Sequence, residues 1–163
     1  MSVVDGLLTN HAIYAATFDQ GHLPPNPSLR LAVVACMDAR LDVFRVLGLR
    51  PGEAQVIRNA GGVVTDDVMR SLVVSQWVSK TEEVVLIRHT DCGTTKFDER
   101  ELAERVATHA GSPLGYAIGA IADPEEVLRR SLRTLRGARE LLHRDRIRGF
   151  VYQVGDGRLV EVE

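Results

Sequence analysis

Cysteine is scarce in this chain: Cys36 and Cys92 are the only two among its 163 residues. They lack C-x-x-C spacing, and two cysteines are too few for the framework of a disulfide-rich protein. A disulfide scaffold and a thioredoxin-like redox pair are therefore not expected. Both cysteines can be free thiolates, which bind soft metal ions.

Long apolar runs and an excess of one charge are also missing. No run approaches the ~20 apolar residues that cross a bilayer, and the first residues lack the basic and apolar regions of a secretion signal. The net charge is only −2, so no strong field draws the chain to nucleic acid or an acidic membrane. We expect a soluble cytoplasmic protein without nucleic-acid or membrane partners.

The length suits a single globular domain over residues 1–163. With 45% apolar composition, the chain can bury a hydrophobic core without the help of disulfide bonds or other cross-links. Residues 3–18 carry apolar side chains at helical spacing, and residues 21–27 are rich in proline. This pattern predicts a helical arm on a stiff tether over residues 1–27. The arm can pack on its own domain or on a partner subunit, and the sequence leaves both possibilities open.

Short apolar segments alternate with helical patterns in the first half. Residues 31–35 are all apolar and end at Cys36, as in a strand buried on both faces. Thr65 is placed to cap a later helix through its hydroxyl. The order strand, helix, strand, helix, strand predicts an α/β fold with right-handed crossovers and a mainly parallel central sheet flanked by helices. The expected strands are 31–36, 53–58 and 84–88, and the expected helices are 41–49 and 65–77.

The second half predicts helices followed by a hairpin. A polar helix over 98–110 precedes a loop, and Pro124 marks the start of another helix, which leucines in phase extend over 125–143. Residues 147–154 and 158–162 flank a Gly-Asp-Gly turn and predict an antiparallel hairpin at the sheet edge.

Eight arginines lie between Arg129 and Arg148. Such a density can indicate a nucleic-acid surface, but Glu140 and Asp145 interrupt the run and aromatic residues are missing from it. We interpret it as a solvated or subunit-facing surface.

Two of the expected strands end in residue types that bind metals. Cys36 ends the first, and the last runs into His89, with Cys92 three positions later. A lone buried cysteine or histidine is usually a core residue, but the carboxyl ends of parallel strands meet at one edge, so these three residues can converge. Two sulfurs and one imidazole favour zinc, and three protein ligands leave a fourth position open, as in catalytic zinc sites.

Asp38 and Arg40 follow the first cysteine closely. A neighbouring guanidinium can keep a carboxylate ionised and aim its free oxygen. Asp38 can therefore accept a hydrogen bond from hydroxide on the metal, or move onto the metal and close the site. The alternative is a solvated surface ion pair. Gly61 and Gly62 follow the second strand, where glycine lets backbone N–H groups approach a small anion, or simply makes a tight turn.

These motifs resemble a known family. Residues 36–40 (CMDAR), 58–62 (RNAGG) and 89–93 (HTDCG) are similar, in order and approximate spacing, to the three signatures of the β-class carbonic anhydrases, in particular their short prokaryotic and archaeal branch. The resemblance is most specific over residues 31–95. Met37 and Ala39 stand where serines are common, but neither replaces a ligand or a member of the acid–arginine pair.

The resemblance implies reversible hydration of carbon dioxide to bicarbonate and a proton, in a homodimer or homotetramer with pockets at subunit interfaces. It implies Asp38 and Arg40 as a catalytic pair and one zinc ion per subunit. The zinc ligands would be Cys36, His89 and Cys92. A bicarbonate-regulated branch has tryptophan where this chain has Val33, so we expect an open site without that regulatory pocket.

Three other functions fit the same residues. Related zinc proteins hydrolyse carbonyl sulfide or carbon disulfide with the same ligands. A non-catalytic zinc module would stabilise an interface, but it leaves Asp38 and Arg40 without a role. A thiol redox protein would be metal-free and would form a reversible disulfide between Cys36 and Cys92.

Overall fold

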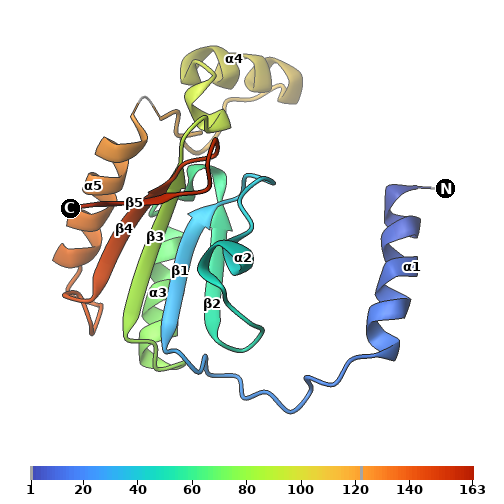
Figure 1. Cartoon of the computed structure of the whole chain (residues 1–163). Coiled ribbons are helices and arrows are strands. Elements are labelled where there is room, and N and C mark those ends of the chain that lie inside the picture. Colours follow the sequence, from blue (N-terminus) through green and yellow to red (C-terminus); the bar gives the residue numbers. More distant parts are fainter. Residues whose placement is uncertain (1, 122) are drawn as a thin grey trace.

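A five-stranded sheet forms the centre of the computed structural model, which describes residues 2–121 and 123–163. The strand order is β2-β1-β3-β4-β5 (Figure 1). The first four strands are parallel and β5 is antiparallel to β4, which confirms the expected α/β fold with an antiparallel edge hairpin. The strands are β1 (Leu31–Cys36), β2 (Ala54–Asn59), β3 (Glu83–His89), β4 (Ile147–Tyr152) and β5 (Leu159–Val162).

Strands β1 and β3 lie inside the sheet and are largely apolar. Every residue of β1 after Leu31 is buried, because both faces of the sheet are covered there. The register pairs Cys36 with Asn59 and Ala35 with Ile87, so β1, β2 and β3 end at the same edge. Residues that follow these strands are therefore brought together at that edge.

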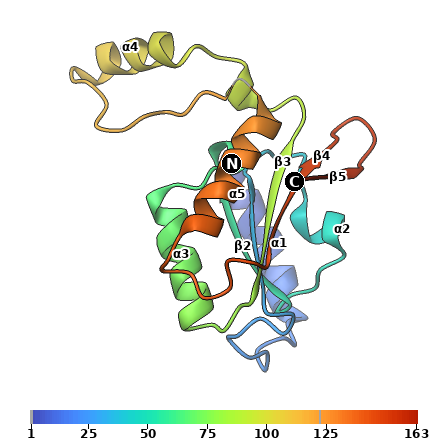
Figure 2. The same ribbon diagram turned by 90° about the vertical axis from the view of Figure 1, so that its left-hand side faces the viewer.

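Helices α3 (Asp66–Trp77) and α5 (Pro124–Gly137) cover one face of the sheet, and α2 (Val43–Leu47) lies on the other (Figure 1 and Figure 2). The larger core lies between the sheet and helices α3 and α5. Alternate side chains of β1 and β3 face this core, and the side chains between them face the opposite side of the sheet. Both faces are buried, which is why these strands are continuously apolar. Its buried members include Val68, Leu72, Leu128, Leu132 and Leu135 from the helices and Ala32, Val34, Val84 and Leu86 from the strands.

Helix α3 begins where predicted, because the Thr65 hydroxyl accepts a backbone N–H of the first turn at 3.3 Å. Helix α5 also begins as predicted, after Asp123. The predicted extent of this helix, 125–143, is wrong at its end, because the helix stops at Gly137. A glycine is a common end of a helix. Beyond it, the side-chain carbonyl of Gln76 in α3 accepts the backbone N–H groups of Leu142 and His143, which fixes that segment outside the helix.

The N-terminal helix α1 (Val3–Ala16) stands away from the sheet on an irregular tether (Figure 1). Ser2 and Asp5 begin it with a reciprocal capping box. None of its residues is buried, and Leu8 is 61% exposed. The helix lies within the predicted residues and does not pack on its own domain, which is one of the two arrangements that the sequence left open.

Helix α4 (Glu99–Ala110) and the loop after it project from the edge where β1 and β3 end (Figure 2). The Glu99 carboxylate accepts the N–H groups of Gly119 and Ala120 at 3.0 and 3.2 Å, which ties the returning loop to the start of the helix. Residue 122 of the predicted loop lies outside the described residues. Among the described helices, none combines the length and the apolar character that a membrane span requires.

Candidate metal centre

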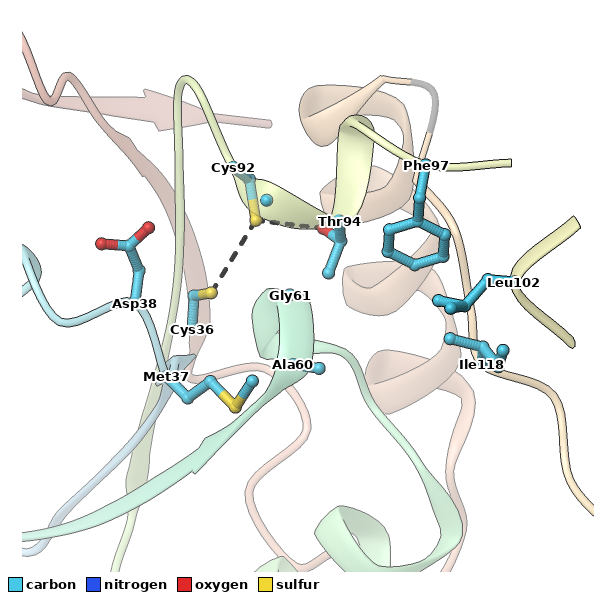
Figure 3. A pocket seen from close by; sticks show the side chains of 11 residues that line it. Cys36, Met37, Asp38, Ala60, Gly61, Cys92, Thr94, Phe97, Leu102 and Ile118 are labelled. Atoms are coloured by element: carbon cyan, nitrogen blue, oxygen red, sulfur yellow. Dashed lines mark hydrogen bonds between the residues drawn. The ribbon is translucent and has the colours of Figure 1, made fainter. Parts of the chain in front are cut away.

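Three ligand-type side chains meet at the carboxyl edge of the sheet. Cys36 ends β1, His89 ends β3, and Cys92 follows in the next turn. One donor atom from each lies within 4.8 Å of the other two. The two sulfurs face one another at 3.8 Å (Figure 3). The structure thus brings together the three residues that the sequence predicted as ligands, because their strands are adjacent, parallel and aligned.

The ring of His89 is oriented for a metal. Its Nδ1 lies 2.9 Å from the carbonyl oxygen of Thr90. Since a carbonyl oxygen only accepts, Nδ1 carries the proton and Nε2 keeps a free lone pair. Nε2 is buried and has no hydrogen-bond partner within the described part of the chain. Such an acceptor is costly, and a zinc ion shared with the sulfurs of Cys36 and Cys92 would remove that cost, so the donor set fits zinc.

Thr94 supports one of the sulfurs. Its hydroxyl oxygen lies 3.0 Å from Cys92 Sγ (Figure 3). A hydroxyl that donates to sulfur stabilises the thiolate form, which is the form that binds metals. The sequence does not predict this role, although the position of Thr94 two residues after a candidate ligand was a signal that could have found it.

Asp38 and Arg40 form a two-point ion pair beside the three ligands. Arg40 Nε donates to Asp38 Oδ1 at 3.0 Å, and Nη2 donates to Oδ2 at 2.8 Å. These hydrogen bonds hold the pKa of Asp38 well below its ordinary value. Asp38 Oδ2 also lies 3.7 Å from His89 Nε2. The carboxylate is therefore ionised, oriented and next to an atom of a candidate ligand, which distinguishes this pair from a solvated surface pair.

Two further residues hold this region together, although the sequence does not predict roles for them. Arg58 Nε donates to the backbone oxygen of Cys36 at 2.9 Å and Nη2 donates to that of Asp38 at 2.7 Å. Asp91 accepts a hydrogen bond from Arg40 at 2.7 Å. Their positions at strand ends were a usable signal, but their partners lie 20 or more positions away in the sequence.

Gly61 and Gly62 pack tightly against neighbouring segments. Their φ angles are +75° and +61°, a region that favours glycine. A Cβ on Gly61 would lie 2.6 Å from Ile121 Cδ1, and a Cβ on Gly62 would lie 2.8 Å from the backbone nitrogen of Cys36. Close packing thus accounts for both glycines, while their contact with a small anion stays a prediction.

A cavity of about 270 Å³ opens beside the three ligands. Cys36, Asp38 and Cys92 lie on its wall, and most of the remaining wall is apolar (Figure 3). Such a wall next to metal-binding atoms suits a small uncharged molecule. The large apolar side chains that line it are Met37, Phe97, Leu102 and Ile118.

The arginine-rich segment pairs extensively with acids. These ion pairs reduce the positive charge available to phosphate groups, in agreement with a solvated surface. The arginines involved are Arg129, Arg133, Arg146 and Arg148, and their partners are Glu125, Glu126, Glu82 and Glu161.

A mainly parallel sheet with two cysteines, a histidine and an aspartate–arginine pair at its carboxyl edge defines a class of α/β metalloproteins, and known proteins share these features. A family model described as carbonic anhydrase matches residues 31–112. The β-carbonic anhydrase 1 of Mycobacterium tuberculosis is 44% identical over 162 residues, which is 99% of each chain. The chain therefore belongs to the β-class carbonic anhydrases, the family that its motifs predicted.

Solved structures and a further relative agree with this family. A carbonic anhydrase from Streptococcus mutans superposes with a TM-score of 0.92 at 37% identity, covering 100% of this chain and 99% of that chain. A carbon disulfide hydrolase from an Acidianus strain is 30% identical over 155 residues, covering 80% of this chain and 76% of that protein.

Proposed function

We propose that this protein catalyses the reversible hydration of carbon dioxide to bicarbonate and a proton, with one zinc ion per subunit held by Cys36, His89 and Cys92. Two observations on His89 carry the proposal: its Nε2 is buried and unpartnered among the described residues, and a nitrogen of its ring lies within 4.8 Å of two sulfurs. The apolar cavity beside these atoms suits carbon dioxide, which is small and uncharged.

When bound, zinc supplies Lewis acidity and makes water acidic enough to yield a nucleophile. Asp38 accepts a hydrogen bond from the attacking water and so aims its lone pair at the substrate carbon. Arg40 keeps this carboxylate ionised through two side-chain hydrogen bonds. The apolar wall holds carbon dioxide, and the backbone N–H groups of Gly61 and Gly62 are the proposed contacts for bicarbonate. One water and one carbon dioxide combine, and one proton is released.

Stopped-flow hydration of carbon dioxide by protein of measured zinc content tests this function. We expect activity and about one zinc per chain in the wild type. Cys36→Ser should lose both, because a hydroxyl is a poor zinc ligand, and circular dichroism checks that this variant is folded. Zinc-loaded wild-type protein without hydration activity would contradict the proposal.

Asp38→Asn separates an enzyme from a zinc module that only stabilises an interface. Asparagine keeps the size of the side chain but cannot accept hydrogen bonds as an ionised carboxylate. We expect full zinc content, a folded protein with a cooperative thermal transition, and a hydration rate about 100-fold lower. The non-catalytic module predicts that neither protein hydrates carbon dioxide.

We expect an open site at neutral pH. Asp38 is paired with Arg40, and Val33 stands where the bicarbonate-regulated branch has tryptophan. A crystal structure of the zinc protein tests this expectation, and Asp38 coordinated to zinc at neutral pH would refute it.

Hydrolysis of carbon disulfide or carbonyl sulfide is a second candidate function. Two observations favour it: the 30% identity with a carbon disulfide hydrolase over 80% of this chain, and an apolar cavity wall that also suits these uncharged molecules. Turnover of carbon dioxide, carbonyl sulfide and carbon disulfide by one zinc-loaded sample decides between them, and the higher kcat/KM identifies the substrate.

A thiol redox function has less support. The sulfurs of Cys36 and Cys92 are 3.8 Å apart, whereas a disulfide bond is about 2.05 Å long, and both cysteines are free. A reversible disulfide in protein purified without zinc would favour this alternative. We also propose a cytoplasmic location, because two cysteines that stay reduced are typical of a reducing compartment.

We further propose that residues 1–163 form one domain whose arm, residues 1–27, packs on a second copy in a homodimer or homotetramer. The exposed fractions of Leu7, Leu8 and Tyr14 in α1 are 58%, 61% and 54%, and apolar side chains at helical spacing need cover. Light scattering should give a dimer or tetramer, and deletion of residues 1–27 should weaken it. A full-length monomer at micromolar concentration would refute this proposal.

A further inference from the structure

Arg40 lies between two carboxylates, of which only Asp38 belongs to the proposed catalytic pair. Arg40 Nη1 donates to Asp91 Oδ2 at 2.7 Å, and Nη2 donates to the backbone oxygen of Asp91 at 2.9 Å. Together with the Nε and Nη2 bonds to Asp38, these contacts occupy all three guanidinium nitrogens. The Arg40 side chain is 46% exposed, so hydrogen bonds rather than packing hold its head in place.

Asp91 is itself held in place. It lies between the candidate ligands His89 and Cys92 and has a φ of +54°. Its Oδ1 lies 2.5 Å from Lys96 Nζ. The Asp91 carboxylate thus lies between two cationic side chains, and it connects the loop of His89 and Cys92 to the guanidinium of Arg40.

Asp38 and Arg40 are two positions apart on one loop, and Arg58 holds the backbone of that loop through the oxygens of Cys36 and Asp38. Neither of these contacts ties the Arg40 side chain to the loop that carries His89 and Cys92. Asp91 is 51 positions away on the ligand loop, and its contact holds the pair against the ligands. A second position for Asp38 is near, because its Oδ2 lies 3.7 Å from His89 Nε2.

We propose that Asp91, supported by Lys96, is a positioning residue that clamps Arg40, so that Asp38 stays paired with Arg40 and leaves the fourth metal position free. This inference rests on the proposed function, in which zinc is bound and Asp38 orients water. Asp91 acts through Arg40 and has no contact with substrate. We call the contacts of Asp91 with Arg40 and Lys96 the clamp. Without it the Arg40 guanidinium becomes more mobile, and Asp38 moves toward the ligands.

Three variants test the clamp. Asp91→Asn removes the charge, keeps an acceptor oxygen and tolerates the left-handed φ. Lys96→Met removes the support of Asp91. Asp156→Asn is the matched control, because it removes the same charge from an exposed ion pair with Arg158 at 2.8 Å. Thermal unfolding of each zinc protein verifies that it is folded.

Hydrogen exchange of the Arg40 Nε–H group reports whether the pair with Asp38 is intact. It is measured by NMR in the zinc protein, and the Arg40 signal is assigned by its loss in Arg40→Lys. We expect exchange about three- to five-fold faster in Asp91→Asn, as suits the loss of an exposed ion pair. Lys96→Met should show a smaller increase, and Asp156→Asn should match the wild type.

Azide binding to the cobalt-substituted protein reports whether the fourth metal position is free. A direct charge effect predicts opposite results, because Asp91→Asn removes a negative charge and Lys96→Met removes a positive one near an anion site. The clamp predicts weaker azide binding in both variants, by about three-fold. Opposite changes in azide affinity, or unchanged Nε–H exchange in Asp91→Asn, would overturn the clamp.

Failure of the clamp and failure of the proposed function give different results. Zinc-loaded wild-type protein that does not hydrate carbon dioxide refutes the function. An active wild type whose Arg40 exchange does not respond to Asp91→Asn refutes only the clamp.

Discussion

At the scale of single residues, the metal centre depends on which atoms remain free after other hydrogen bonds are made. His89 Nδ1 is hydrogen-bonded to the Thr90 carbonyl, so Nε2 is the ring nitrogen left with a free lone pair. Arg40 donates two hydrogen bonds to the Asp38 carboxylate and so fixes its orientation. In each case a second contact fixes the orientation of a side chain, as is usual around the ligands of a metal site.

Gly62→Ala should weaken the fold through the backbone beside a ligand. The new Cβ would lie 2.8 Å from the nitrogen of Cys36, at a φ of +61°. We expect the free energy of unfolding to fall by about 1–3 kcal/mol, measured with urea, and zinc to bind less tightly. Gly48→Ala is the control, because its φ is +66° but a Cβ there meets no described atom within 4 Å. Equal losses in both variants would attribute the effect to backbone strain alone.

The pKa of Asp91, lowered from 3.8 to about 2, predicts a pH dependence of stability. A carboxylate with a lowered pKa in the folded state stabilises the fold above its unfolded pKa, and this contribution is lost as the pH falls from about 4 to about 2. Asp91→Asn should therefore melt below the wild type at neutral pH, and the two midpoints should converge near pH 2. Scans of both proteins with chelator present remove the effect of zinc loss, and a constant difference would contradict the expectation.

At the scale of elements, the aligned ends of β1 and β3 bring the ligands together, and α3 and α5 hold the sheet from one face. Local patterns predict where these elements begin. Thr65 caps α3 as its sequence position predicts. The leucine spacing extended the prediction past the observed end of α5 at Gly137, although a glycine there is a local signal for a helix end. The Gln76 hydrogen bonds hold Leu142 and His143, which lie beyond that end.

Leu132→Ala should destabilise the sheet by removing part of its cover. Leu132 is 1% exposed in the core between α5 and the strands. We expect a loss of about 2–5 kcal/mol in unfolding free energy. Leu142→Ala, at a site 46% exposed, should cost less than about 0.5 kcal/mol. Urea unfolding measures both, and equal losses would place Leu132 outside the core that supports the sheet.

At the scale of the whole molecule, the metal centre joins distant parts of the chain. Cys36 and Cys92 are 56 positions apart, and a zinc ion between them would cross-link two strand ends and the following turn. The arm α1 is separate from this body and buries none of its residues. Stability and assembly should therefore respond to different changes, metal removal for the first and arm deletion for the second.

Removal of zinc should lower the thermal midpoint. A metal that binds only the folded state stabilises it by about 2.7 kcal/mol at a free concentration 100 times Kd. Unfolding of the wild type with and without a chelator measures this effect. The thermal midpoint of Cys36→Ser, which we expect to lack zinc, should not change when the chelator is added. A wild-type midpoint that is equal with and without the chelator would contradict a zinc site in the folded protein.

The sequence by itself determined the parallel strands, the position of the candidate metal ligands at the ends of two of them, and the aspartate–arginine pair. These features depend on continuous apolar runs and on residues only a few positions apart, so local pattern is enough to predict them. Only the tertiary structure decided that Arg58 and Asp91 hold the loop that carries Asp38 and Arg40, and that α1 buries none of its residues. Each of these depends on contacts made or missing between distant segments, which a linear pattern does not contain.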